Sequence, residues 1–103
     1  IDNRASHLFV DMMEFFNKGQ KATFGWEGGP LHDPTTIAYL IDPTVVTVDN
    51  MNTDVDIRSG QSYGRTNCDI FHMSGKPRDS YVALDIDVDK FWDIVEQCIR
   101  LYG

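Results

Sequence analysis

The sequence has few of the features that mark secreted or membrane proteins. It contains only two cysteines, Cys68 and Cys98, which are too few for a disulfide scaffold. It has no Asn-x-Ser/Thr site, and no apolar run approaches the length of a membrane span. The first residues, Ile1–Arg4, lack the charged and apolar regions of a signal peptide. We therefore expect two free thiols in a cytoplasmic protein without a membrane partner.

Basic residues are also scarce. Nine Lys and Arg stand against 16 Asp and Glu, which gives a formal net charge of −7. A protein that binds a polyanion needs a basic surface to release counterions, and no run of Lys and Arg supplies one. We therefore expect no nucleic-acid partner. The remaining composition, 42% hydrophobic and 24% charged, is typical of a globular protein rather than a disordered one.

Three segments show helical periodicity. The first covers about residues 3–18, with Asn3 as the expected N-cap and Gly19 as the expected end. The second is expected from Asp33-Pro34 to Asp42-Pro43, because proline is favoured in the first turn of a helix and disfavours helix in the preceding residue. The third is expected to run from Asp87 or Asp89 to about Tyr102. The apolar positions of the first helix predict a buried stripe, formed by Leu8, Met12, Phe15 and Phe16.

The middle of the chain favours strands. Residues 45–57 are rich in Val, Ile and Thr and predict one or two strands, followed by a turn at 59–61 and a return strand over residues 63–70. Residues 20–30 are expected to be a loop or a frayed helix end, 73–79 a surface loop, and 81–86 a further strand. This order predicts an α+β fold for the isolated piece, compatible with attachment to a larger α/β body. The chain also begins at Ile1 rather than at Met, which suggests either a piece of a longer protein or the removal of a leader.

The segment with most chemical information is residues 28–34, Gly-Gly-Pro-Leu-His-Asp-Pro. It places His32 and Asp33 side by side at the head of a helix, where the positive end of the helix dipole lies. Asp33 could cap the helix or hold a hard cation, and a histidine can transfer a proton near neutral pH. The alternative is structural, because Asp-Pro is a routine helix start and a single histidine is usually a polar loop residue. From these residues alone, the structural interpretation is favoured.

Residues 28–43 resemble the C-terminal signature of the inosine-uridine-preferring nucleoside hydrolases. Further similarity lies at Val55-Asp56, Gly60, residues 63–66, Asp69, residues 75–77, Asp87 and Phe91-Trp92. The resemblance extends from about Phe15 to Tyr102 and is closest to pyrimidine-preferring members. It implies that residues 1–103 are the C-terminal segment of an open α/β, Rossmann-like nucleoside hydrolase fold.

The resemblance also implies roles for particular residues. In this family a calcium ion binds the ribose hydroxyls and a water molecule, and Asp33 corresponds to the C-terminal calcium ligand. His32 corresponds to the leaving-group acid or to a residue that contacts the base. Gln20 and Phe24 fall where base-contacting side chains occur in pyrimidine-preferring relatives. Those relatives have tyrosine at the place of Phe24, which puts a tyrosine-dependent proton relay in doubt, and Phe24 could equally pack on the first helix.

The family's N-terminal aspartate cluster has no counterpart in this sequence. Asp54-x-Asp56 is not followed by paired carboxylates, and residues 85–89 resemble an EF-hand start but have Lys90 where that loop needs glycine. We interpret 85–89 as a strand end and a helix cap. The Ca²⁺ site is therefore expected to be incomplete, and the chain inactive without the N-terminal portion of the enzyme.

Two roles are therefore compatible with the sequence. In the first, the chain is part of an enzyme that cleaves purine or pyrimidine ribonucleosides into ribose and free base. In the second, it is a non-catalytic fragment or a truncated relative that acts as a structural, antigenic or oligomerisation module. The family commonly forms dimers or tetramers, so a homo-oligomer is a further expected partner. An upstream aspartate cluster in the source reading frame would favour the first role.

Overall fold

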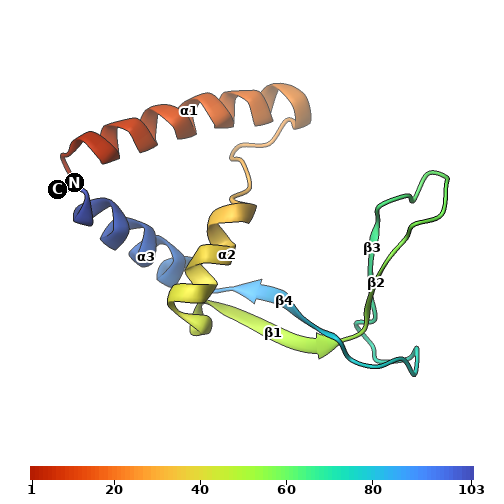
Figure 1. Cartoon of the computed structure of the whole chain (residues 1–103). Helices are drawn as coiled ribbons and strands as arrows, with labels where there is room; N and C mark the ends of the chain where they lie inside the picture. Colours follow the sequence, from red (N-terminus) through yellow and green to blue (C-terminus); the bar gives the residue numbers. More distant parts are fainter. The chain divides into compact units, whose positions relative to one another are not determined.

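The computed structural model describes all 103 residues, which form three α-helices, a short 3-10 helix and four strands (Figure 1). They divide into two compact units. The helical unit comprises residues 1–45 and 87–103, and the strand unit comprises residues 46–86. The mixture of helices and antiparallel strands confirms the predicted α+β class for this piece.

Helix α1, Arg4–Phe24, begins as the sequence predicts and ends later. Asn3 forms a capping box, in which its side chain accepts from the Ser6 N–H at 2.7 Å and its own N–H donates to Ser6 Oγ at 3.1 Å. The predicted end at Gly19 was wrong. The helix instead ends at Gly25, which takes the left-handed conformation (φ 72°) that glycine adopts without steric cost. Gln20 is consequently helical, which agrees with the helix-end alternative for residues 20–30 rather than with the loop.

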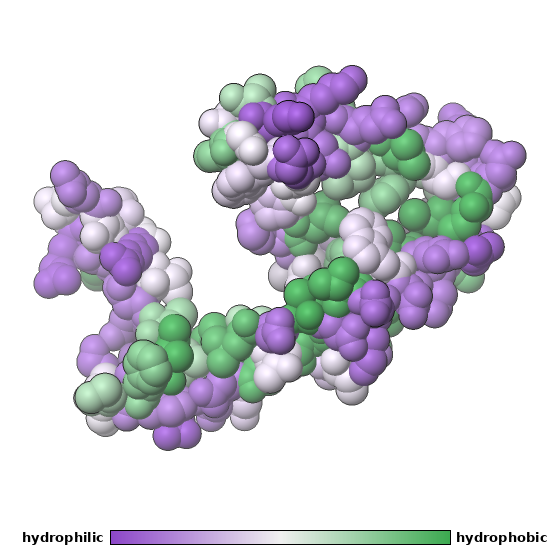
Figure 2. Space-filling view, turned by 180° about the vertical axis from the view of Figure 1, so that it is seen from behind, coloured by the Kyte–Doolittle hydropathy of each residue, from purple (hydrophilic) through white to green (hydrophobic).

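The apolar stripe of α1 is largely exposed, so its prediction as core was wrong. Leu8, Met12 and Phe15 are 61%, 60% and 81% exposed, and only Phe16 is half-buried. The buried hydrophobic residues of the helical unit are Ala38, Val45 and Phe91. Periodicity shows that a helix has an apolar side, but burial also requires another element to cover that side. The chain's own helices leave most of it open, and Figure 2 shows hydrophobic residues at the surface between them.

Helices α2, His32–Ile41, and α3, Val88–Leu101, complete the helical unit. Helix α2 begins close to the predicted position and stops before Pro43, where the 3-10 helix Pro43–Val45 follows. Asp87 caps α3 by accepting from the Lys90 N–H at 3.1 Å. This confirms the interpretation of residues 85–89 as a strand end and a helix cap. Near the two termini, Asn3 Nδ2 donates to the Ile99 carbonyl at 2.9 Å and ties α1 to α3 (Figure 1).

The strand unit contains two antiparallel pairs. Strand β1, Val46–Met51, pairs with β4, Ser80–Ile86, and β2, Thr53–Val55, pairs with β3, Thr66–Cys68. These pairs confirm the prediction of one or two strands within 45–57, which are two, and the return strand, which is shorter than predicted. Residues 73–79 have no regular structure, as predicted.

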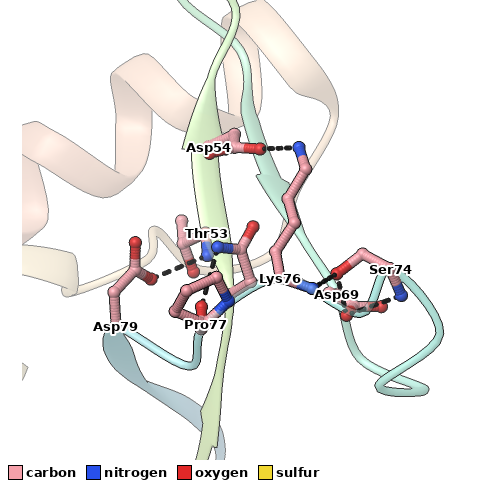
Figure 3. Close-up of polar contacts among 8 residues, drawn as sticks. Thr53, Asp54, Asp69, Ser74, Lys76, Pro77 and Asp79 are labelled. Carbon is pink, nitrogen blue, oxygen red and sulfur yellow. Dashed lines mark hydrogen bonds and ion pairs between the residues drawn. The ribbon is translucent and has the colours of Figure 1, made fainter.

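Side-chain hydrogen bonds hold the irregular residues 69–79 of the strand unit (Figure 3). The Asp69 carboxylate accepts from Ser74 Oγ at 2.6 Å and from the Met73 and Ser74 N–H groups at 3.0 and 3.1 Å. Lys76 Nζ lies 2.6 Å from Asp54 Oδ2. The hydrogen bonds from the Ser74 hydroxyl and the Met73 N–H lower the pKa of Asp69 below its usual value.

Acid is expected to destabilise this loop through Asp69. A carboxyl group whose pKa is lower in the folded state stabilises that state above its unfolded pKa, and this contribution is lost as the pH falls through the folded value. Urea unfolding at about pH 5.5 and about pH 3 should therefore show a smaller loss of stability for Asp69→Asn than for wild type. Asp11→Asn, at an exposed carboxylate on α1, is the control and should retain the wild-type acid loss. Equal losses in all three proteins would contradict this assignment.

Two observations bear on the expectations about thiols and membranes. Cys68 and Cys98 are both free, as predicted. None of the three helices combines the length and the apolar character needed to span a lipid bilayer.

Candidate functional site

A cavity of about 470 Å³ lies between α1 and the loop that leads into α2. Its volume is within the usual range of small-molecule sites, which are mostly apolar with a few polar groups. Three lining residues, Gln20, His32 and Asp33, are polar or ionisable. The others are apolar: Met12, Met13, Phe16, Pro30, Leu31 and Pro34.

The cavity brings together three of the four site residues predicted from the sequence. Gln20 comes from the last turns of α1, whereas His32 and Asp33 are the first two residues of α2. Phe24 does not line it. Its ring stacks on Trp26, with centroids 4.7 Å apart and planes inclined by 23°. Trp26 therefore covers one face of the Phe24 ring.

Asp33 does not act as the cap of α2. The cap position is Leu31, which supplies no side-chain hydrogen bond, and Asp33 lies one residue inside the first turn. Its carboxylate is exposed and makes no hydrogen bond within the chain, although the positive end of the helix dipole favours a negative charge there. The capping alternative therefore does not describe Asp33, whose oxygens are free to bind a ligand.

The His32 side chain likewise makes no contact that stabilises the fold. Its imidazole is exposed, borders the cavity and has no hydrogen-bond partner within the chain. By contrast, the other two histidines are paired, His7 with Asp2 at 2.7 Å and His72 with Asp49 at 2.9 Å. The first two residues of α2 thus place an unpaired imidazole and an unpaired carboxylate at the edge of one cavity.

Sequence reasoning missed Asn17, which holds the loop against α1. The Gly29 N–H donates to Asn17 Oδ1 at 2.9 Å. Gly29 lies so close to α1 that a Cβ there would be 3.0 Å from Gln20 Cγ and would overlap the Phe16 ring. The only sequence signal was an asparagine inside a helix, where this residue type is unfavourable.

The donor set for a metal ion is small. No three His, Cys, Asp or Glu side chains come together where they could hold a metal. Calcium takes about six to eight oxygen ligands, of which a carboxylate supplies one or two. The free carboxylate of Asp33 suits a calcium ion. Such an ion would need further oxygen ligands beyond those of the residues that line the cavity.

The comparisons with known proteins agree with one another. The family model described as inosine-uridine preferring nucleoside hydrolase matches residues 1–93. The chain is 46% identical over 98 residues to the pyrimidine-specific ribonucleoside hydrolase RihB of Escherichia coli (strain K12 / DH10B), covering 95% of this chain and 31% of the relative. Its identity to the putative RihB of Shigella dysenteriae serotype 1 is also 46%, over 95% of this chain and 36% of that protein.

A solved structure is similar as well. The purine-preferring ribonucleoside hydrolase from Gardnerella vaginalis superposes with a TM-score of 0.69 at 34% identity, covering 87% of this chain and 28% of that chain. The chain thus spans about a third of the length of the proteins that it matches.

Proposed function

The chain belongs to the inosine-uridine preferring nucleoside hydrolase family, and from this we propose that it is the C-terminal part of a ribonucleoside hydrolase. The whole enzyme would cleave the N-glycosidic bond of purine or pyrimidine ribonucleosides and release ribose and the free base. The observation that carries this proposal is the cavity in which Gln20, His32 and Asp33 meet. The names of the relatives, all ribonucleoside hydrolases, support it.

His32 is proposed to assist the departure of the base. As the bond to the base nitrogen breaks, negative charge develops on the base, and a positioned acid can neutralise it with a proton. The imidazole is suited to this task because it borders the cavity and no other group of the chain engages its nitrogens. A contact with the base that orients it, without proton transfer, is the other role that this position allows.

Asp33 is proposed to be a calcium ligand. Its carboxylate is exposed, makes no hydrogen bond and lies one residue from His32, so an ion held there would be close to the proposed acid. When bound, calcium would supply a Lewis acid for the ribose hydroxyls and for the attacking water. The remaining ligands would come from an N-terminal portion of the enzyme that would carry the family's aspartate cluster.

The α1 side of the cavity is proposed to receive the base. Met13 and Phe16 offer apolar surface, and Gln20 offers an amide that can both donate and accept hydrogen bonds. Phe24 can add a stacking surface only with the face that Trp26 leaves free. Because Phe24 has no hydroxyl, no proton relay runs through it. The 46% identity to pyrimidine-specific relatives supports pyrimidine nucleosides as substrates.

Exposed hydrophobic residues support the proposal that the chain is one part of a larger domain. Twenty-four large hydrophobic residues are exposed, among them Leu8, Met12 and Phe15 on α1, whereas only four hydrophobic residues are buried. Large apolar patches are uncommon on monomeric soluble proteins and usually mark contact surfaces. The same exposure favours the second candidate function, a non-catalytic module that associates with copies of itself.

The test is the release of ribose by the complete enzyme, meaning the whole protein that carries this chain. We expect uridine and inosine to be hydrolysed in the presence of Ca²⁺. Chelation with EGTA should stop the reaction, and excess Ca²⁺ should restore it. If neither nucleoside is hydrolysed with Ca²⁺ present, the hydrolase proposal is wrong and the non-catalytic module is favoured.

A further inference from the structure

We infer that Asn17 is a positioning residue of this site, which acts by fixing the loop that carries His32. The inference rests on the proposed function, because it assigns to Asn17 a role in placing the imidazole for the departing base. It does not assign any contact between Asn17 and a substrate, since Asn17 is not among the residues that line the cavity.

One side of α1 forms the seat for the loop. Phe16, Asn17 and Gln20 lie three, four and seven positions after Met13 in α1. This spacing places all four side chains on the same side of the helix. Three of them line the cavity, and Asn17 accepts the Gly29 N–H at 2.9 Å. The residue that positions the loop and the residue proposed to contact the base therefore lie on one rigid surface.

The contact between Asn17 and Gly29 is the principal attachment of the loop. No other hydrogen bond involves residues 26–30. The loop also approaches α1 so closely that a Cβ at Gly29 would collide with the Phe16 ring. One directional bond and one close packing contact thus fix the same residue, and removing the bond leaves only the packing contact.

The position of Gly29 is transmitted to His32 over a short and stiff path. His32 lies three residues beyond Gly29, and Pro30 between them has a backbone φ fixed by its ring. His32 is also the first residue of α2, at the end that the loop controls. Asp33 lies one residue further inside the helix, which the buried Ala38 anchors. Loss of the Asn17 contact should therefore displace the imidazole more than the carboxylate.

If Asn17 positions His32, its removal should lower kcat by an amount that depends on the leaving group of the substrate. In the complete enzyme, Asn17→Ala should lower kcat for uridine by about 10- to 100-fold, as a displacement of about 1 Å can do. The kcat for p-nitrophenyl riboside should change little, because nitrophenolate departs without a proton. Asn17→Asp keeps an oxygen at the same place and should restore most of the uridine kcat. A general loss of structure would lower both activities together.

Two further variants distinguish a displaced loop from a general loss of folding. Gly29→Ala should reproduce the Asn17→Ala pattern, because the added methyl group and the Phe16 ring must move apart and the loop then loses its close packing on α1. Lys18→Ala changes the exposed neighbour of Asn17 and should behave as wild type. A wild-type uridine kcat for Asn17→Ala would overturn the inference. Equal losses on both substrates that Asn17→Asp fails to restore would also overturn it.

Amide exchange keeps this inference separate from the proposed function. In the complete enzyme the Gly29 N–H should exchange slowly with deuterium, and Asn17→Ala should make it exchange rapidly. If the wild-type enzyme hydrolyses no nucleoside, the proposed function fails, and exchange alone decides whether Asn17 fixes the loop. Equal exchange rates in wild type and Asn17→Ala would show that it does not.

Discussion

Asp33→Ala in the complete enzyme is expected to weaken calcium binding and to lower kcat/KM for uridine by about 10³-fold, because a catalytic metal contributes several kcal/mol to the transition state. The melting temperature should stay close to the wild-type value. The Asp33 carboxylate is exposed and bonded to nothing in the chain, so the fold does not depend on it. Calcium titration by calorimetry and steady-state kinetics measure the two effects.

Two companion variants define what the Asp33 result means. Asp33→Asn keeps an oxygen and the side-chain size but removes the charge, so its calcium affinity should lie between those of wild type and Asp33→Ala. Asp11→Ala removes an exposed carboxylate from α1, far from the head of α2 in sequence, and should bind calcium as wild type does. Wild-type calcium affinity together with wild-type turnover in Asp33→Ala would show that the ligand assignment is wrong.

His32→Ala is expected to lower kcat for uridine by about 10²- to 10⁴-fold, the usual contribution of a general acid. The loss should be much smaller for p-nitrophenyl riboside, whose leaving group needs no proton. The free imidazole predicts that the effect is catalytic rather than structural, because its removal breaks no hydrogen bond. Kinetics with both substrates measure the difference.

The same experiment distinguishes the two roles proposed for His32. If the imidazole orients the base without giving a proton, KM for uridine should rise while kcat for uridine is retained. His7→Ala is the matched control, because it removes an exposed histidine whose partner, Asp2, lies outside the cavity. Unchanged kcat and KM in His32→Ala would exclude both roles.

Local signals in the sequence predicted the helix starts and the strands well. Asn3 and Asp87 cap α1 and α3 as expected, because a cap depends on residues within one turn. The end of α1 was less predictable, since Gly19 and Gly25 are equally able to stop a helix and only Gly25 does so. The burial of Leu8, Met12 and Phe15 could not be predicted, because it depends on elements that the periodicity of α1 does not describe.

The candidate site was predictable in part. The residue types and order in 28–34 identified His32 and Asp33, and the resemblance added Gln20. The contact of Asn17 with Gly29 joins residues twelve positions apart and depends on how the loop folds back on α1, which no local pattern specifies. The stacking of Phe24 on Trp26 depends on the turn at Gly25. That turn could not be predicted while the helix was expected to end at Gly19.

The central claim is that these 103 residues supply His32 and Asp33 to a hydrolase site completed by other residues. Its most direct test is the release of ribose from uridine and inosine by the 103-residue chain alone, with excess Ca²⁺ and with the His32→Ala chain as control. We expect no release of ribose above the control. Calcium binds about six to eight oxygen ligands, and one carboxylate supplies too few of them. Clear hydrolysis that His32→Ala removes would contradict the claim, because the chain would then form a complete site by itself.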